Sequence, residues 1–188
     1  MAEVTCAWEL AAPSLAQYAS LLVLAQQLST GDGRLDPSLL AGLPLPDFIK
    51  AVLARAQRMT SLAFTRKGLL LSVTSASDPR VLKESYEDVV ASLAQAQVEL
   101  QTAEALSSAR LASTNKQALG YPEPADLARL MARMEACGLT GLDVFALQRA
   151  CAEVTPVSME ALLASFGPVP SAVVMVMPGV GAGEPDEG

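Results

Sequence analysis

The chain has 188 residues and a formal net charge of −7, and its sequence pI is near 4.6. An acidic surface repels phosphate backbones and anionic lipids, so we expect no direct binding to nucleic acid or to membrane surfaces. The longest apolar runs, such as residues 21–25 and 68–71, are too short for membrane insertion. The sequence contains no histidine, which excludes Ser-His-Asp and Cys-His catalysis and every metal site that needs imidazole. The three cysteines lie far apart and outside CxxC spacing, which argues against a disulfide framework and a structural zinc site. We therefore predict no cofactor, no metal site and no enzyme activity.

The composition favours an all-α protein. Of the residues, 51% are hydrophobic and only 4% are aromatic, and Ala and Leu, the strongest helix formers, dominate the apolar set. The first thirteen residues, MAEVTCAWELAAP, carry two glutamates and no basic residue, unlike a signal or transit peptide. We therefore expect an intracellular, soluble protein, either cytoplasmic or nuclear.

The first predicted helix begins near Ser14, and its leucines cover so much of its surface that it should be buried. After it comes STGDGRLDPSLL at residues 29–40, whose centre matches part of a calcium-binding loop. Leu28 and Leu39 stand at the first and twelfth positions, where calcium needs carboxylates. The segment is better explained by glycines that end one helix and by Asp36-Pro37, which begins a short one. A further helix is expected from Asp47 to about residue 62, and residues 69–73 are interpreted as a helix end.

The longest predicted element is a helix over about residues 79–113, opened by Asp78-Pro79. Apolar residues follow one another along it at alternating steps of four and three, which is a heptad pattern over three repeats. This seam consists of Leu82, Tyr86, Val89, Leu93, Ala96, Leu100 and Ala103. Two interpretations stay open, because such a seam packs either within a helical bundle or against another chain.

The predicted organisation is a helical bundle over residues 1–113, a linker over 114–125, three short helices over 126–167 and a flexible acidic tail over 168–188. The three short helices contain a Gly138-Leu139 turn and, further on, the pair Leu162-Leu163. This order resembles ubiquitin-associated and CUE-type domains, although Cys137 stands where that family usually has Met and Leu139 replaces its aromatic residue. The resemblance implies that Gly138, Leu139, Leu162 and Leu163 contact the apolar patch of ubiquitin.

The tail contains a short β-prone run, Ala172–Met177. Three interpretations stay open for it: a strand added to the sheet edge of another protein, a disordered end, or a cover for the chain's own helices. Taken together, the patterns predict a non-enzymatic helical scaffold subunit that binds protein partners, or joins a larger assembly, through apolar helix faces. A homo-oligomer is compatible with this prediction. The alternatives are a binder of ubiquitin-like proteins and, with a cavity between helices, a carrier of an apolar ligand or a histidine-independent enzyme.

Overall fold

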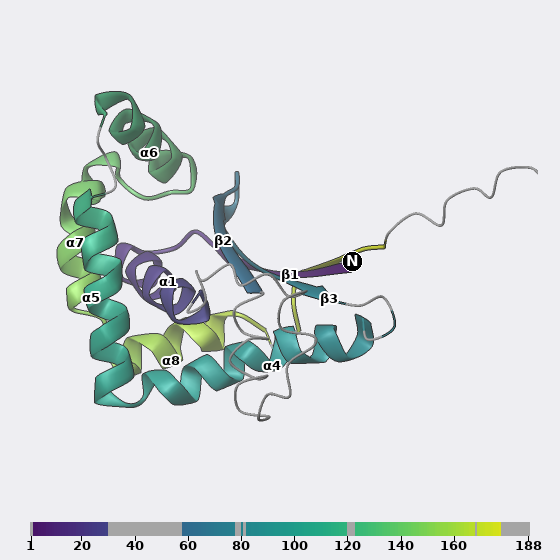
Figure 1. Cartoon of the computed structure of the whole chain (residues 1–188). Coiled ribbons are helices and arrows are strands. Elements are labelled where there is room, and N and C mark those ends of the chain that lie inside the picture. Colours follow the sequence, from purple (N-terminus) through teal and green to yellow (C-terminus); the bar gives the residue numbers. More distant parts are fainter. Residues whose placement is uncertain are drawn as a thin grey trace, which may run out of the picture.

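Four strands form one antiparallel sheet, which contradicts the all-α prediction. The computed structural model describes residues 2–29, 58–77, 80, 82–119, 123–167 and 169–177. The strands are β1 (Ala2–Ala11), β2 (Arg58–Phe64), β3 (Gly68–Ser77) and β4 (Ala172–Val176), in the order β2-β3-β1-β4. The protein therefore has an α/β fold, shown in Figure 1.

The N-terminal strand β1 is the centre of this sheet, and its sequence explains why. Val4, Cys6, Trp8 and Leu10 are all buried, whereas the residues between them are mostly exposed or half-buried. A period of two places these four side chains on one face of a strand. The partner strand β3 repeats the pattern with Leu69, Leu71 and Val73, in register opposite Leu10, Trp8 and Cys6. One face of the sheet is thus apolar and covered by helices.

The helices surround α1, as Figure 1 shows. α1 packs against the sheet and against four other helices. It begins where it was predicted to begin, and Ser14 caps it: Ser14 Oγ accepts from Gln17 N and the Gln17 side chain accepts from Ser14 N. The predicted buried first helix is confirmed. The helices are α1 (Leu15–Leu28), α4 (Leu82–Leu100), α5 (Ala103–Leu119), α6 (Pro124–Ala136), the 3-10 turn η2 (Gly141–Asp143), α7 (Val144–Ala152) and α8 (Pro156–Ser165).

The predicted long helix over 79–113 is wrong, because the chain breaks into α4 and α5 at Gln101 and Thr102. Thr102 Oγ1 donates to the Glu99 carbonyl at 2.8 Å and accepts from Ala105 N at 3.3 Å. A hydroxyl in this position competes with the helical backbone bonds and begins a new helix instead. α5 then continues to Leu119, through the first half of the segment expected to be a linker.

Other expectations also need correction. Residues 58–62, predicted to be helical, belong to β2, and residues 69–73 belong to β3 rather than to a helix end. The candidate calcium segment, the short helix after Asp36-Pro37 and the helix start at Asp47 lie outside the described residues. The third C-terminal helix could have been expected to begin at Ser158, but Thr155 caps it and Pro156 lies in its first turn. The strand β4 replaces part of the predicted flexible tail, and the division into domains stays a prediction.

The tight hairpin between β2 and β3 depends on Gly68. Thr65 Oγ1 accepts from the N–H groups of Lys67 and Gly68, and Thr65 N donates to the Gly68 carbonyl. A Cβ at Gly68 would collide with the Leu10 carbonyl oxygen of β1. The glycine therefore lets β3 approach β1 closely.

We predict that Gly68→Ala lowers the free energy of unfolding by about 1–3 kcal/mol, because the clash is with backbone that cannot move aside cheaply. Gly167→Ala is the matched control, since the nearest atom to its Cβ would be 3.9 Å away. Urea unfolding followed by circular dichroism measures both variants. Equal stability of Gly68→Ala and Gly167→Ala would contradict the close approach of β3 and β1.

Candidate functional site

The heptad seam lies inside the chain. Val89, Leu93, Ala96 and Leu100 are buried in the hydrophobic core, and α4 packs against β1, β3, α1 and α8. Leu82 and Tyr86 are half-buried against the same core, whereas Ala103 is exposed at the start of α5. The seam thus has the internal packing that was one of its two interpretations, and a scaffold function through this helix face is contradicted.

The four residues of the ubiquitin-binding alternative do not form an exposed patch. Leu139 and Leu162 are buried, Leu163 packs partly buried against the core, and Gly138 is an exposed turn residue with φ +93°. Side chains that fill the chain's own core cannot contact a partner without local unfolding. The resemblance to ubiquitin-associated domains therefore fails as a prediction of function.

The three cysteines are free and buried. Desolvation by burial raises the pKa of Cys6 and Cys137, and raises the pKa of Cys151 to about 11. Since the thiolate is the nucleophile and the metal ligand, a raised pKa makes these thiols poor in both roles. Among the residues that the structure describes, no three His, Cys, Asp or Glu side chains lie close enough together to hold a metal ion.

We predict a stability signature for Cys151. Its pKa is about 11 when folded against an ordinary value of 9.0, so the unfolded chain loses its proton first as pH rises. The stabilisation from the neutral buried thiol is complete below pH 9 and is lost between pH 9 and 11. The free energy of unfolding of the natural chain should therefore fall more steeply over this range than that of Cys151→Ala, by up to about 3 kcal/mol. Lys and Tyr side chains are the same in the natural chain and in Cys151→Ala, so their effect cancels in the comparison. If the free energy of unfolding falls equally steeply with pH in both proteins, the desolvation of the Cys151 thiol is contradicted.

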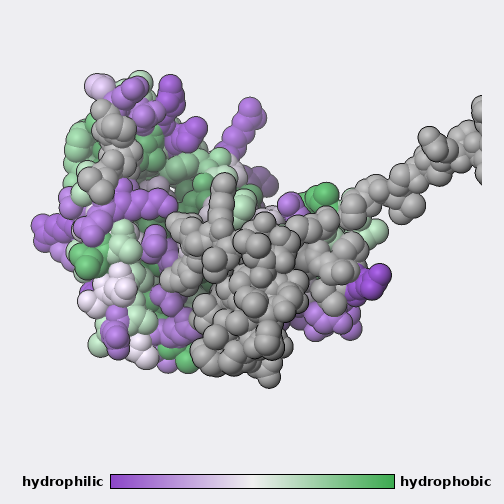
Figure 2. All heavy atoms as spheres, viewed as in Figure 1, coloured by the Kyte–Doolittle hydropathy of each residue, from purple (hydrophilic) through white to green (hydrophobic). Residues whose placement is uncertain are grey.

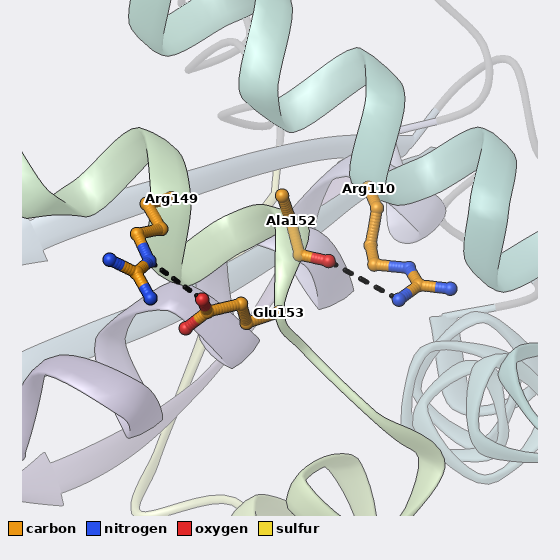
Figure 3. A network of polar contacts seen from close by, with 4 residues as sticks. All are labelled: Arg110, Arg149, Ala152 and Glu153. Carbon is orange, nitrogen blue, oxygen red and sulfur yellow. Dashed lines mark hydrogen bonds and ion pairs between the residues drawn. The ribbon is translucent and has the colours of Figure 1, made fainter.

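An exposed polar network joins α5 to the end of α7 (Figure 3). Arg110 Nη1 donates to the Ala152 carbonyl at 3.3 Å, and Arg149 Nε donates to Glu153 Oε1 at 2.7 Å. The hydrogen bond and charge of Glu153 raise the pKa of Arg149. Arg110 satisfies a carbonyl that the helix itself leaves unpaired at its C-terminus. The network is explained by helix packing, and it does not place a nucleophile beside a general base.

The strand β4 lies at one end of the sheet among the described strands. It pairs with β1 along one side, from Glu3 opposite Val176 to Ala7 opposite Ala172, and Ser171 Oγ accepts from Glu9 N at its start. The other side of β4 has no strand beside it, because β4 ends the sheet order among the described strands.

All five residues of β4 are exposed, although none of them is polar. Val174 is 55% exposed and Met177, just beyond the strand, is 64% exposed. Apolar side chains, drawn in green, are visible in Figure 2 on the side of the molecule where Figure 1 draws the yellow strand β4 beside β1. The β-prone run is thus a strand of the chain's own sheet, paired with β1, which is none of the three interpretations of the sequence. In the described part of the chain, the outer side of β4 has no neighbouring strand.

The comparisons with known proteins give the fold a context. No family model matches the chain, and no curated protein sequence matches it to a significant degree. Among solved structures, the inactive peptidase domain of a proposed zinc protease from Bordetella parapertussis superposes with a TM-score of 0.69 at 15% identity, over 95% of this chain and 91% of that one. A proposed zinc protease from Bordetella pertussis Tohama I gives a TM-score of 0.68 at 16% identity, over 95% and 94% of the two chains.

The fold is like that of zinc-protease peptidase domains. This finding overturns the helical scaffold, the ubiquitin binder and the ligand-carrier alternatives together. The periplasmic protease PqqL from Escherichia coli contains the same fold, with a TM-score of 0.60 at 10% identity, and 95% of this chain covers 19% of that protein. The matched region thus spans most of each of the two Bordetella chains and a small part of PqqL.

None of the helices in the described part of the chain is both long enough and apolar enough to cross a bilayer. The cytoplasmic or nuclear location stays a prediction. PqqL, for comparison, is a periplasmic protein.

Proposed function

We propose that this chain is a non-catalytic domain of peptidase-like fold that binds another protein through the free edge of β4. The observation that carries the proposal is an apolar strand that is exposed at the end of the sheet. The likeness to a domain described as an inactive peptidase domain supports the non-catalytic part.

The absence of histidine from the sequence supports the loss of catalysis. The common catalytic zinc sites use three protein ligands that include at least one histidine, together with a water molecule that the metal activates. Cysteine is the other strong zinc ligand, but Cys6, Cys137 and Cys151 are buried with raised pKa values. A chain with this inventory has no ordinary set of ligands for a catalytic zinc ion.

The chemistry of β4 supports association by strand addition. An unpaired edge presents backbone N–H and C=O groups that another strand can bind. Natural proteins usually protect such edges with lysines, prolines, bulges or a covering element. Here the strand AVVMV contains no charge and no proline, and Val173, Val174 and Val176 are exposed on its two faces.

The partner that fits is an extended apolar segment of another chain. Main-chain hydrogen bonds to β4 would supply the affinity, and the exposed valines would select apolar side chains on the added strand.

We expect Val174→Lys to weaken partner binding at least about tenfold, because a charge beside the added strand must be desolvated or repelled. Met59→Lys is the matched control, since Met59 is 70% exposed on the strand at the opposite edge of the sheet. Affinity enrichment from cells of the native organism, with quantitative mass spectrometry, should show partners that bind the natural chain and Met59→Lys but not Val174→Lys. Each such partner is then purified and its dissociation constant is measured.

Partners that bind Val174→Lys as tightly as the natural chain would contradict the β4 interface. Circular dichroism and thermal unfolding of both variants confirm that the comparison is between folded proteins.

We also expect no peptidase activity. Fluorescently quenched casein incubated with the chain and Zn²⁺ should be cleaved no faster than in a buffer control. Cleavage that scales with protein concentration, co-elutes with the chain and is abolished by a chelator would contradict the non-catalytic assignment.

A further inference from the structure

The strand β4 differs from its neighbour β1 in the chemistry of its two faces. Directly opposite residues of an antiparallel pair lie on the same face of the sheet. Met175 is opposite Val4, and Val173 is opposite Cys6. Since both of these β1 residues are buried in the core, Val173 and Met175 lie on the face of the sheet that the helices cover.

The residues between them lie on the opposite face, because successive side chains of a strand alternate. Val174 is opposite Thr5, and Val176 is opposite Glu3. On this face β1 is thus polar, as is usual for an antiparallel strand with one face in water. The strand β4 has no such polar face, since its sequence AVVMV contains no polar side chain at all. Continuous apolar runs of this kind are typical of strands that are buried on both faces.

Neither face of β4 is buried in the described part of the chain. Val173 and Met175 are 40% and 51% exposed on one face. Val174 and Val176 are 55% and 53% exposed on the other. The described helices pack against β1, β2 and β3, whereas β4 packs extensively only against β1. The helix layer that covers the rest of the sheet therefore leaves the side chains of β4 in water.

A single added strand does not bury these side chains completely. It pairs with the backbone of β4 along the free edge, and its side chains contact those of β4 only from one side. Burial of a sheet face needs a further layer, a helix or a second sheet, packed about 10 Å away from it. Complete burial of β4 therefore needs an added strand and a layer on each face, and a flexible peptide does not supply these layers.

We propose that the partner at β4 is a folded domain whose own sheet is covered on both faces. Its edge strand pairs with β4, and its covering layers extend over Val173 and Met175 on one face and over Val174 and Val176 on the other. The inference rests on the proposed function and names the class of partner. Two other occupants are a free peptide strand and another segment of this same chain, and the test separates them from a folded domain.

The test is carbene footprinting, in which a photoactivated diazirine labels exposed side chains and mass spectrometry locates the label. The full chain carries an affinity tag and is labelled alone and in an extract of cells of the native organism, to which it is added in trace amount. Val98, which is 65% exposed on α4, is the internal reference. We expect strong labelling of the four exposed β4 side chains in the isolated chain. In the extract, labelling on both faces should fall at least about threefold relative to Val98, because the partner's layers cover them.

Two substitutions test the two faces separately. Val173→Thr and Val174→Thr each replace a methyl group by a hydroxyl and keep the shape and the strand preference of the side chain. Each should weaken binding of the purified partner at least about threefold, because a hydroxyl is buried there without a hydrogen-bond partner. Val98→Thr is the matched control and should leave the dissociation constant unchanged.

Three results would overturn the folded partner. Loss of labelling on one face alone, or unchanged affinity in Val173→Thr or in Val174→Thr, would show that one face of β4 stays in water. Weak labelling of the same side chains in the isolated chain would show that another segment of this chain covers them.

The remaining outcomes separate this inference from the proposed function. If the outward amides of β4 exchange more slowly in the extract while both faces are still labelled, strand addition stands and only the folded partner is overturned. If labelling and amide exchange are both unchanged in the extract, both proposals are contradicted.

Discussion

The structure depends on the burial of α1. The helix packs against the sheet on one side and against α4, α5, α7 and α8 on the others, so its side chains are enclosed almost all round. Leu21, Val23 and Leu24 have no exposed surface, and burial of each contributes roughly 1.5–3 kcal/mol. The one polar side chain fully enclosed on this helix, Ser20, lies 3.3 Å from the Ser158 hydroxyl of α8. Because the core around α1 is apolar and closed, we look for function at the surface of the protein. The two edges of the sheet are the most distinctive parts of that surface.

Prediction from the sequence succeeded for helices and strands that a local sequence pattern defines. The buried first helix was predicted from its leucines, with its start near Ser14, and the β-prone character of the run after Ser171 was recognised from its valines. The helices of the C-terminal part were placed by their glycine and proline boundaries. Each of these signals is local, because caps, turns and β-branched residues act within a few positions of the chain.

The sheet was missed because its signal is spread over distant segments. In β1 the buried positions Val4, Cys6, Trp8 and Leu10 alternate in the manner of a strand, but the average composition, rich in Ala and Leu, favoured helices instead. In β2, Met59 and Leu62 satisfy a helical spacing, and only the pairing with β3 makes the strand geometry the favourable one. The heptad seam of α4 shows a second limit of prediction from sequence. Packing on a sheet and packing on a second helix both require an apolar stripe, so the pattern could not identify what the stripe contacts.

The two edges of the sheet have different chemistry. At the β2 edge, polar side chains surround a cavity beside Lys116, whereas the β4 edge is uncharged and apolar. The sequence contains no histidine, and this supports our proposal of binding rather than catalysis. We propose that the main function lies in β4, a part of the sequence that was predicted to be a flexible tail.

The most direct measurement of this claim is residue-resolved amide hydrogen exchange of the isolated chain by NMR. In an antiparallel edge strand, alternate N–H groups point to the neighbouring strand and the others point away from the sheet. We therefore expect residues 172–176 to alternate between amides protected by β1 and amides that exchange at nearly the rate of an open chain. Protection of all these amides would show that the outer side of β4 is already occupied, and protection of none would show that β4 is not paired with β1; either result would contradict a free edge ready for a partner.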